Sequence, residues 1–479
     1  MWCDLGQTIR IDVLPDEVLL EIFDFYANMY PSGGLKMDIE AWQSLVHVCR
    51  RWRSLVLGSP RRLNLRLFCT PKTPARDTLD VWPALPLFIA NFEELASGVE
   101  NVIAALGQSN RVRSVDLYSL RDLELEKVLA TMQVPFPELT RLSLSSLDKT
   151  SPASPPVIPD SFLDGYAPRL QEFTLSGIPF PGVPKLLLSA THLVHLEITS
   201  IPHSGYISPE AMVAPLCVLS SLESLSLGFQ PSQSRLGLES RSLPPSKRST
   251  LPALAKFHFD GFTEYLEGLV SFIDTPQLNS MHITFFNQID FDCPRLIQFI
   301  KCTRTLWGLD QAYLQFDDFF AHVTFPSRPG CLCIKIPSRE PYLQLRSVAQ
   351  VCNFCLPRPS TVEDLYIERR FGRLKLVWKN AYDAIEHTIP WLQLLLPFTA
   401  VKNLYLSKEF APIIAAALQK LVGTGITEVL PSLQNIFVEE LVPSGPFQDN
   451  IWQFDDARQL SDPPITISVW DKYSSMKRV

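Results

Sequence analysis

Charged residues and long apolar runs are both scarce in this chain of 479 residues. Asp, Glu, Lys and Arg make up 19% of the residues and hydrophobic residues 46%, a balance typical of folded globular proteins and not of disordered chains. Aliphatic runs such as Leu186–Leu188 and Leu394–Leu396 are far shorter than the roughly 20 residues that cross a bilayer. We therefore expect a large buried core and no membrane-spanning segment.

Glycine is also scarce, with 20 glycines against 40 prolines. Proline fixes the backbone φ angle and interrupts helices, so we expect short helices and many turns of fixed geometry. A chain of this length exceeds one ordinary hydrophobic core, which predicts two or more domains or a long repeat array.

The chain lacks an excess of positive charge. Its 43 Lys and Arg residues against 50 Asp and Glu give a formal net charge of −7, which argues against a general nucleic-acid binder. Ten cysteines are spread along the chain, and its first residues show neither a basic flank nor the apolar core of a signal peptide. We expect reduced cysteines and an intracellular protein, in the cytoplasm, the nucleus or both.

The motifs of common catalytic sites are missing. The sequence contains no Gly-x-x-x-x-Gly-Lys phosphate loop, no Gly-x-Gly-x-x-Gly turn after a strand, no Gly-x-Ser-x-Gly elbow and no His-Glu-x-x-His helix. Neighbouring carboxylates such as Asp317 and Asp318 show no separation into an acid and a base. We predict that the chain is not an enzyme and binds no cofactor.

Two amphipathic helices are predicted near the N-terminus. Leu14-Pro15-Asp16-Glu17 is typical of a helix start, and the first helix should run to about Tyr26 with one apolar stripe. The second should begin near Glu40 and carry apolar residues at helical spacing as far as Val56. Two such helices can cover each other.

The residues of these helices resemble the F-box pattern at both ends, in LPDEVLLEIF at 14–23 and LVHVCRRWR at 45–53. In that family the module binds the Skp adaptor of SCF (Skp, cullin, F-box) ubiquitin ligases. The resemblance implies that adaptor contacts, or their support, come from Leu14, Pro15, Val18, Leu19, Ile22, Val48, Cys49 and Trp52. The link from Asn28 to Ile39 is longer than in compact F-boxes and is where the sequence departs from the family.

Residues before about position 90 are also similar to the expanded F-box families of mushroom-forming fungi, in the segments 48–53, 58–63 and 82–86. Residues 41–76 carry no acidic side chain and eight basic ones, namely Arg50, Arg51, Arg53, Arg61, Arg62, Arg66, Lys72 and Arg76. A nucleic-acid patch and a solvated helix face are both possible readings. Electrostatic steering of this basic segment toward an acidic protein partner agrees better with the sequence.

Short strands of the form apolar-x-x-apolar-x-apolar recur through the rest of the chain. Arg62–Leu67 alternates with period two, and full copies begin at Val112, Leu139, Leu170, Leu193, Leu222, Leu254, Leu278, Val362, Val401 and Leu433. The first seven copies are 27, 31, 23, 29, 32 and 24 residues apart, in or near the leucine-rich-repeat range of roughly 20 to 29. Residues 309–316 and 332–336 resemble strands without clear repeat spacing.

Stacked copies of such a unit form a solenoid, with a curved parallel sheet and with helices or loops on its convex side. The predicted fold class is therefore α/β, a short N-terminal helical F-box followed by an irregular leucine-rich-repeat solenoid. We place the F-box helical module at 8–60, a transition into the repeats at 61–105, the solenoid at 106–445 and a C-terminal segment at 446–479.

Residues between the buried positions of each strand should face the concave side of the solenoid. Early strands offer small polar residues there. Later ones offer His258, Asp260, His282, Tyr366, Glu368, Tyr405, Phe437 and Glu439. Aromatic residues commonly dominate binding energy at interfaces, so we place a target-binding surface on these later strands.

Two groups of residues could ligate a metal. Cys331, Cys333, Cys352 and Cys355 offer thiols close in sequence, and His192, His195 and His203 offer imidazoles. Buried reduced cysteine and packed repeat positions are the commoner states, so we predict no metal site.

These features together predict a substrate-recognition subunit of an SCF-type ubiquitin ligase. Its F-box would bind the Skp adaptor, and through it a cullin scaffold, while the repeats hold an unknown protein target. We expect no nucleic-acid or membrane partner. The alternative is an F-box and leucine-rich-repeat scaffold that is not coupled to degradation, and a zinc-containing protein or an enzyme has the least support.

Overall fold

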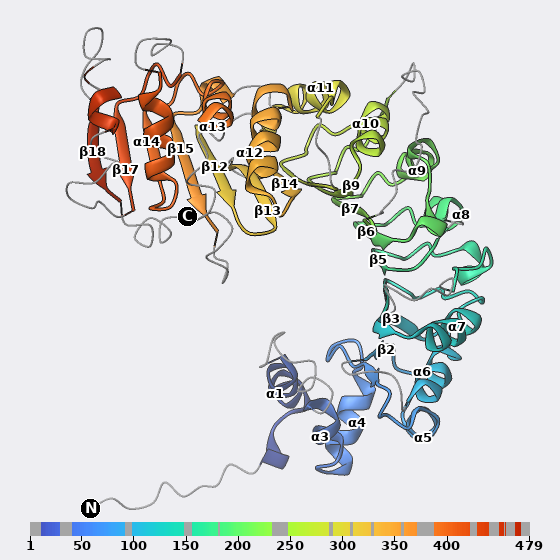
Figure 1. Ribbon diagram of the computed structural model, residues 1–479. Helices are drawn as coiled ribbons and strands as arrows, with labels where there is room; N and C mark the ends of the chain where they lie inside the picture. The colour runs from blue at the N-terminus through green and yellow to red at the C-terminus, as the bar shows by residue number, and fades with distance from the viewer. Residues whose placement is uncertain are drawn as a thin grey trace, which may run out of the picture. The chain divides into compact units, whose positions relative to one another are not determined.

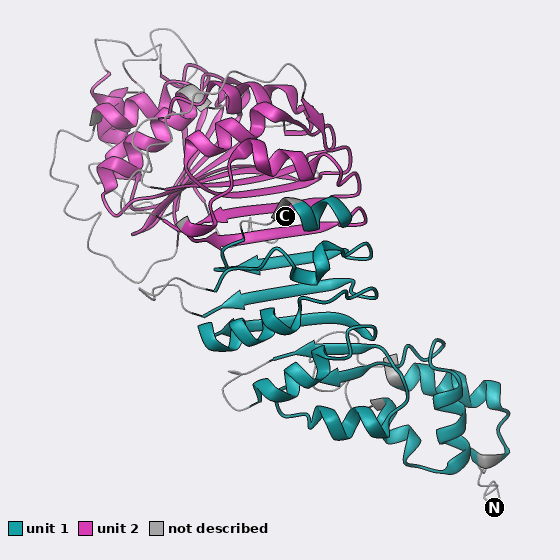
Figure 2. Ribbon diagram, turned by 90° about the vertical axis from the view of Figure 1, so that its right-hand side faces the viewer, with its two compact units in different colours: residues 1–190 teal, residues 191–479 magenta. Residues whose placement is uncertain are grey.

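The computed structural model divides the chain into two compact units, residues 1–190 and residues 191–479, which Figure 2 colours separately. The described residues are 11–28, 41–91, 98–147, 156–180, 183–231, 248–286, 291–306, 310–326, 330–355, 359–370, 388–421, 429–439, 450–454, 456 and 465–470. The long link predicted at 28–39 lies outside them except for Asn28. The domain boundaries proposed from the sequence stay a prediction.

Unit 1 begins with a helical module, formed by α1 (Asp16–Asn28), α3 (Ala41–Val46) and α4 (Arg50–Gly58) after a 3-10 turn at Ile11–Val13. Helix α1 begins as predicted, with Asp16 and Glu17 in its first turn at the positive end of the helix dipole. The prediction of a single second helix is wrong, because Cys49 interrupts it. The Cys49 backbone is extended, and its sulfur accepts the N–H of Trp52 at 3.5 Å, which caps a new helix.

Repeating strand and helix elements follow in unit 1. They are β1 (Leu67–Cys69), α5 (Ala75–Val81), β2 (Leu87–Ala90), α6 (Val99–Leu106), β3 (Val112–Leu120), α7 (Asp122–Thr131), β4 (Arg141–Ser146), η3 (Phe162–Gly165), β5 (Glu172–Ser176) and α8 (Val183–Ser189). Strands β1 to β5 pair in parallel in chain order (Figure 1). The strand predicted at Arg62–Leu67 is wrong, since residues 61–64 form a turn with Asn64 at φ 47° and β1 starts only at Leu67.

Unit 2 continues the pattern of strands and helices. Its first part contains β6 (His195–Ile201), α9 (Pro209–Leu216), β7 (Ser224–Phe229), β8 (Ser249–Thr250), β9 (Lys256–Gly261), α10 (Thr263–Phe272), β10 (Ile273–Asp274), β11 (Ser280–Phe285) and α11 (Pro294–Cys302). Its second part contains β12 (Gln311–Phe316), β13 (Phe320–Pro326), β14 (Cys331–Pro337), α12 (Pro341–Gln350), a π-helical turn η6 (Val351–Cys355), β15 (Asp364–Arg369), α13 (Thr388–Leu395), β16 (Asn403–Leu406), α14 (Ala411–Gln419), β17 (Asn435–Val438) and β18 (Thr466–Val469).

The strands of unit 2 pair in the order β6-β7-β9-β11-β14-β13-β12-β15-β16-β17-β18, while β8 and β10 form a separate pair. The prediction of a parallel sheet is wrong at β12, β13 and β14, where β13 runs antiparallel to both neighbours. Only residues 317–319 connect β12 to β13, and a parallel crossover needs about a dozen residues or more. The short link therefore forces an antiparallel hairpin inside an otherwise parallel arrangement.

Alternate burial along most strands of unit 2 places the hydrophobic core between those strands and the helices. In β9, Phe257 and Phe259 are buried while His258 and Asp260 are partly exposed on the opposite face. The described helices of unit 2 lie on the buried side of its strands (Figure 1). The other side, which we call the open face, carries the polar members of each strand.

Except at Val112, which is the first residue of β3, the first apolar residue of each sequence motif lies two residues before its strand. Leu254 and Leu278 are fully buried two residues ahead of β9 and β11, and Leu222 precedes β7 in the same way. Each anchors the turn that enters the strand.

The core of unit 2 yields a matched test of burial on one segment. Leu394 is fully buried, whereas Leu396, two residues on, is 44% exposed. We expect Leu394→Ala to lower the free energy of unfolding by about 2 to 5 kcal/mol, because it leaves a cavity among packed side chains. Leu396→Ala should lower it by less than about 1 kcal/mol. Urea unfolding followed by circular dichroism measures both, and equal losses would contradict the placement of this core.

Candidate protein-interaction surfaces

Helix α1 has one buried and one exposed apolar face. Leu19, Leu20 and Phe23 are buried against α3 and α4. The exposed face carries Val18, Ile22, Phe25 and Tyr26, which are 42%, 41%, 69% and 40% exposed. These four residues recur at helical spacing and form what we call the α1 stripe. A contiguous exposed apolar stripe is typical of an interaction site.

Five of the eight residues predicted at the adaptor interface are exposed, two are half-buried and one is buried. Pro15, Val18, Ile22, Val48 and Cys49 are exposed, and Leu14 is half-buried. The other two support the module from within: Leu19 is fully buried, and the half-buried ring of Trp52 lies 4.7 Å from that of Phe23.

The prediction missed Phe25 and Val13, which are also exposed apolar residues. The signal for Phe25 was in the sequence, since it lies seven residues after Val18 on the same helix face.

Several arginines of the basic segment hold the module together. Arg51 bonds the Asp16 carboxylate at 2.5 and 3.1 Å and the Leu14 carbonyl oxygen at 2.6 Å, so it ties α4 to the start of α1. Arg62 pairs with Glu21, and Arg53 donates to the Val46 carbonyl oxygen at 2.9 Å. Exposed ion pairs of this kind each contribute little to stability, about 0 to 1 kcal/mol.

The open face of unit 2 carries a continuous line of side chains. Strand register aligns Ser226, His258, His282, Cys333, Thr324, Tyr313, Tyr366, Tyr405, Phe437 and Ser468, one from each of ten neighbouring strands. We call this line the central row. Five of the eight predicted target-binding residues belong to it. Asp260 and Glu368 lie in the next row, and Glu439 directly follows β17.

The aromatic members of the central row stack on one another. Tyr313 and Tyr366 have ring centroids 4.4 Å apart, Tyr366 and Tyr405 4.2 Å, and Tyr405 and Phe437 4.6 Å, with interplanar angles of 8° to 11°. The buried ring of Trp470 lies 5.4 Å from Tyr405 and 5.8 Å from Tyr366. The stacked faces are thus occupied by one another, and a partner would meet ring edges and hydroxyl groups.

Polar side chains continue beside this stack. Asn403 Nδ2 donates to Asp364 Oδ1 at 2.7 Å, and Asn435 Nδ2 donates to Asn403 Oδ1 at 2.7 Å. Burial raises the pKa of Tyr366 and Tyr405, so their hydroxyls stay protonated at neutral pH. The predicted residue Glu368 is buried, and Gln315 Nε2 lies 3.4 Å from its carboxylate. It is therefore less accessible than the sequence suggested.

Histidines occupy the other end of the row. His258 Nε2 lies 3.1 Å from Asp260 Oδ2, and this hydrogen bond raises the pKa of His258. The ring of His282 stacks on that of His258, with centroids 6.1 Å apart, and burial lowers the pKa of His282. One imidazole therefore favours its charged form, whereas its neighbour favours the neutral one.

The structure places the cysteines considered as metal ligands on different elements. Cys331 and Cys333 share the open face of β14, while Cys352 is buried in η6, and the side chain of Cys355 lies outside the described residues. His192 and His195 are exposed at the entry to β6. Among the residues that the structure describes, no three such side chains are placed to hold a metal ion.

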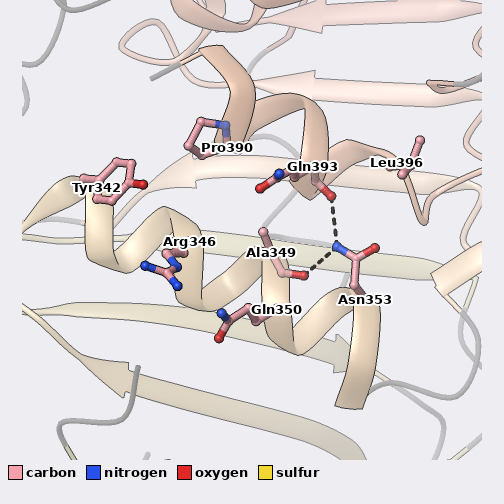
Figure 3. A pocket seen from close by; sticks show the side chains of 8 residues that line it. All are labelled: Tyr342, Arg346, Ala349, Gln350, Asn353, Pro390, Gln393 and Leu396. Carbon is pink, nitrogen blue, oxygen red and sulfur yellow. Dashed lines mark hydrogen bonds between the residues drawn. The ribbon is translucent and has the colours of Figure 1, made fainter. Parts of the chain in front are cut away.

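A pocket of about 510 Å³ lies on the helix side of unit 2, between α12 and α13 (Figure 3). It is lined by Tyr342, Arg346, Ala349, Gln350, Asn353, Pro390, Gln393 and Leu396. Asn353 Nδ2 donates to the carbonyl oxygens of Ala349 at 2.7 Å and Gln393 at 2.9 Å, which links the two helices. This pocket is on the side of the sheet opposite to the central row.

Comparison with known proteins identifies the N-terminal module. Residues 11–64 match the model of the F-box-like family. No curated protein matches the sequence. One similar solved structure is the leucine-rich repeat-containing protein LegL7 from Legionella pneumophila, at 13% identity and a TM-score of 0.29, with 81% of this chain and 97% of that chain covered.

The predicted fold class is confirmed, as an F-box-like helical region followed by strand and helix units with a largely parallel sheet. None of the described helices is long and apolar enough to cross a membrane.

His322, beside the central row, gives a pH-dependent prediction. Burial and Arg370, whose Nη1 lies 3.3 Å from the ring, lower the pKa of His322 to about 4, although Asp317 at 3.7 Å opposes the shift. The unfolded chain therefore takes up this proton first as pH falls. We expect the free energy of unfolding to decrease between about pH 6.5 and pH 4, by on the order of 2 to 3 kcal/mol from this residue.

Urea unfolding across that pH range, in wild type and in His322→Gln, measures the contribution. The variant should show the weaker pH dependence. Identical slopes for the two proteins would contradict the environment described for His322.

Proposed function

We propose that the chain is the substrate-recognition subunit of an SCF-type ubiquitin ligase. In this role the F-box-like domain binds the Skp adaptor, and through it a cullin scaffold, while the open face of unit 2 binds a protein target. F-box domains generally bind Skp-type adaptors, and the F-box-like match at residues 11–64 supports the same partner here. The expectation of an intracellular protein, in the cytoplasm or nucleus, belongs to the same proposal.

The single observation that carries this proposal is the α1 stripe. Val18, Ile22, Phe25 and Tyr26 leave an apolar face exposed on a module whose core is already filled by Leu19, Phe23 and Trp52. Burying these side chains in a partner removes apolar surface from water, worth roughly 25 cal/mol per Å². Val48 adds an exposed apolar contact at the break between α3 and α4.

The contribution of the chain to ubiquitin transfer would be proximity and not chemistry. Holding a target close to a ubiquitin-charged enzyme on the same scaffold raises the effective concentration of its lysines. F-box and leucine-rich-repeat folds are typical of non-enzymatic interaction proteins, which agrees with the lack of catalytic motifs in the sequence. The likeness to fungal F-box families rests on residues before about 90 and stays a prediction.

The chemistry of the central row indicates what kind of target surface would fit. Its aromatic faces are stacked, so recognition would depend on the hydroxyls of Tyr313, Tyr366 and Tyr405 and on the Asp364, Asn403 and Asn435 ladder. These groups offer both donors and acceptors in fixed positions. A polar target segment that lies across several strands would match them.

Loss of adaptor binding is the first test. Val18→Glu with Ile22→Glu places two carboxylates in the α1 stripe, where adaptor contact would have to desolvate them. We expect recovery of the Skp adaptor with the full-length chain to fall about 30-fold or more in co-purification. Val81→Glu, at an exposed valine of α5, is the control and should leave adaptor recovery unchanged.

The same double variant separates a degradation receptor from a passive scaffold. For a receptor, a bound target should accumulate in cells that express the variant, because the target is held but no longer ubiquitinated. A scaffold would leave target levels as they are in cells with the wild-type chain. Unchanged adaptor recovery in a folded double variant would sink the proposal itself.

Removal of hydroxyls from the central row tests the target surface. Tyr313, Tyr366 and Tyr405 changed together to Phe keep the stacked rings and remove three hydroxyl groups, each worth about 1 kcal/mol when hydrogen-bonded. We expect the amount of target captured by the full-length chain to fall about 10-fold or more, as measured by quantitative mass spectrometry. Tyr118→Phe, at an exposed tyrosine of β3, is the matched control. Equal capture by all three proteins would exclude the central row.

A further inference from the structure

A thiol and an imidazole meet on the open face of unit 2. Cys331 opens β14, and His282 lies in the middle of β11, the parallel neighbour of that strand. The Cys331 sulfur lies 3.4 Å from His282 Nε2 and 3.7 Å from Ser280 Oγ. Both side chains are partly exposed, on the side of the strands that the described helices leave uncovered. Small molecules in solution can therefore reach this pair.

The surrounding charges suit a base at His282. Burial and the neighbouring charge of His258 lower the pKa of His282, so its ring is neutral near pH 7 and can accept a proton. The ring of His258 stacks on that of His282 and is paired with Asp260. A neutral imidazole 3.4 Å from a thiol sulfur can accept the thiol proton as the sulfur attacks.

We propose that Cys331 is a reactive thiol that undergoes exchange with low-molecular-weight disulfides, with His282 as its general base. The Cys331 sulfur attacks one sulfur of the disulfide while His282 Nε2 takes the thiol proton. A new S–S bond forms, the original S–S bond breaks, and the leaving thiolate receives the proton from His282. One disulfide is consumed and one is formed, so no further oxidant is needed.

Cys333 provides an internal comparison two residues along the same strand and on the same face. Its sulfur accepts the Thr324 hydroxyl at 3.5 Å, and burial raises its pKa. A thiol held in its protonated form by burial is a poor nucleophile. The two cysteines therefore share a strand and a face but differ in their immediate partners and in burial.

The mixed disulfide would lie beside His282 in the central row. If the open face binds a target, as proposed above, the added group would occupy part of that surface and couple target binding to the thiol–disulfide state of the cell. The exchange reaction itself does not depend on the presence of a target.

The test uses the full-length reduced chain and oxidised glutathione at pH 7, with each cysteine-containing peptide quantified by mass spectrometry over time. We expect Cys331 to be modified at least about tenfold faster than Cys333, which is less than the roughly 10²- to 10⁴-fold that a positioned general base can supply. His282→Gln should slow Cys331 by about tenfold and leave Cys333 unchanged. His195→Gln, the same substitution at an exposed histidine of β6, should leave both rates unchanged.

Two outcomes would overturn the proposal. One is equal modification of Cys331 and Cys333 in the wild-type chain, a comparison that needs no variant to fold. The other is an unchanged Cys331 rate in His282→Gln whose circular dichroism matches that of wild type. Because neither readout involves adaptor or target, failure here is distinct from failure of the proposed ligase role.

Discussion

The open face of unit 2 depends on one constraint. Its strands bury every second residue, and they pair in a register that aligns the buried residues of neighbouring strands. Phe257, Met281 and Leu332 form a buried row, and the register that aligns them also aligns His258, His282 and Cys333 on the opposite side. A slip of one residue in any strand would turn its apolar set to solvent. The polar rows are thus fixed by the hydrophobic core and not by contacts among themselves.

The spacing between strands explains why the tyrosines stack. Neighbouring strands lie about 4.7 to 4.9 Å apart, close to the distance at which aromatic rings stack. Centroid separations of 4.2 to 4.6 Å along Tyr313, Tyr366, Tyr405 and Phe437 follow from this match. The hairpin of β12 and β13 preserves the row although β13 runs the other way, because side chains alternate with period two in either direction.

Much of this architecture could be predicted from the sequence, because the period of the pattern is the period of the strand. Each motif from Val112 onward lies on a strand, and the central row contains five of the residues predicted from it. The prediction failed where a single side chain ends a helix and where strands far apart in the sequence pair with each other. The apolar spacing of the second helix continues through Cys49, so periodicity alone could not reveal the cap that divides it.

The pairing of strands that lack a clear motif could not be predicted from the sequence either. Strands β2 and β18 are short and carry no complete motif, and the hairpin at β12 to β14 was seen only as isolated strand-like segments. Tyr313 was missed for that reason, although it joins directly to Tyr366 in the row. Trp470 could not be assigned either, since its contact with Tyr405 joins residues far apart in the chain.

The two surfaces differ in the physical basis of recognition. The α1 stripe is apolar, and its burial in an adaptor, as proposed, would gain free energy chiefly by releasing water. The central row offers hydroxyls and amides whose positions are already set by stacking and by the Asp364, Asn403 and Asn435 ladder. Groups fixed before binding lose little conformational entropy on contact. A partner that excludes water without pairing their remaining donors and acceptors leaves those atoms unpaired, at a cost of about 1 to 3 kcal/mol each. In the proposed function, selectivity would therefore reside in the central row, whereas the α1 stripe would supply attachment to the adaptor.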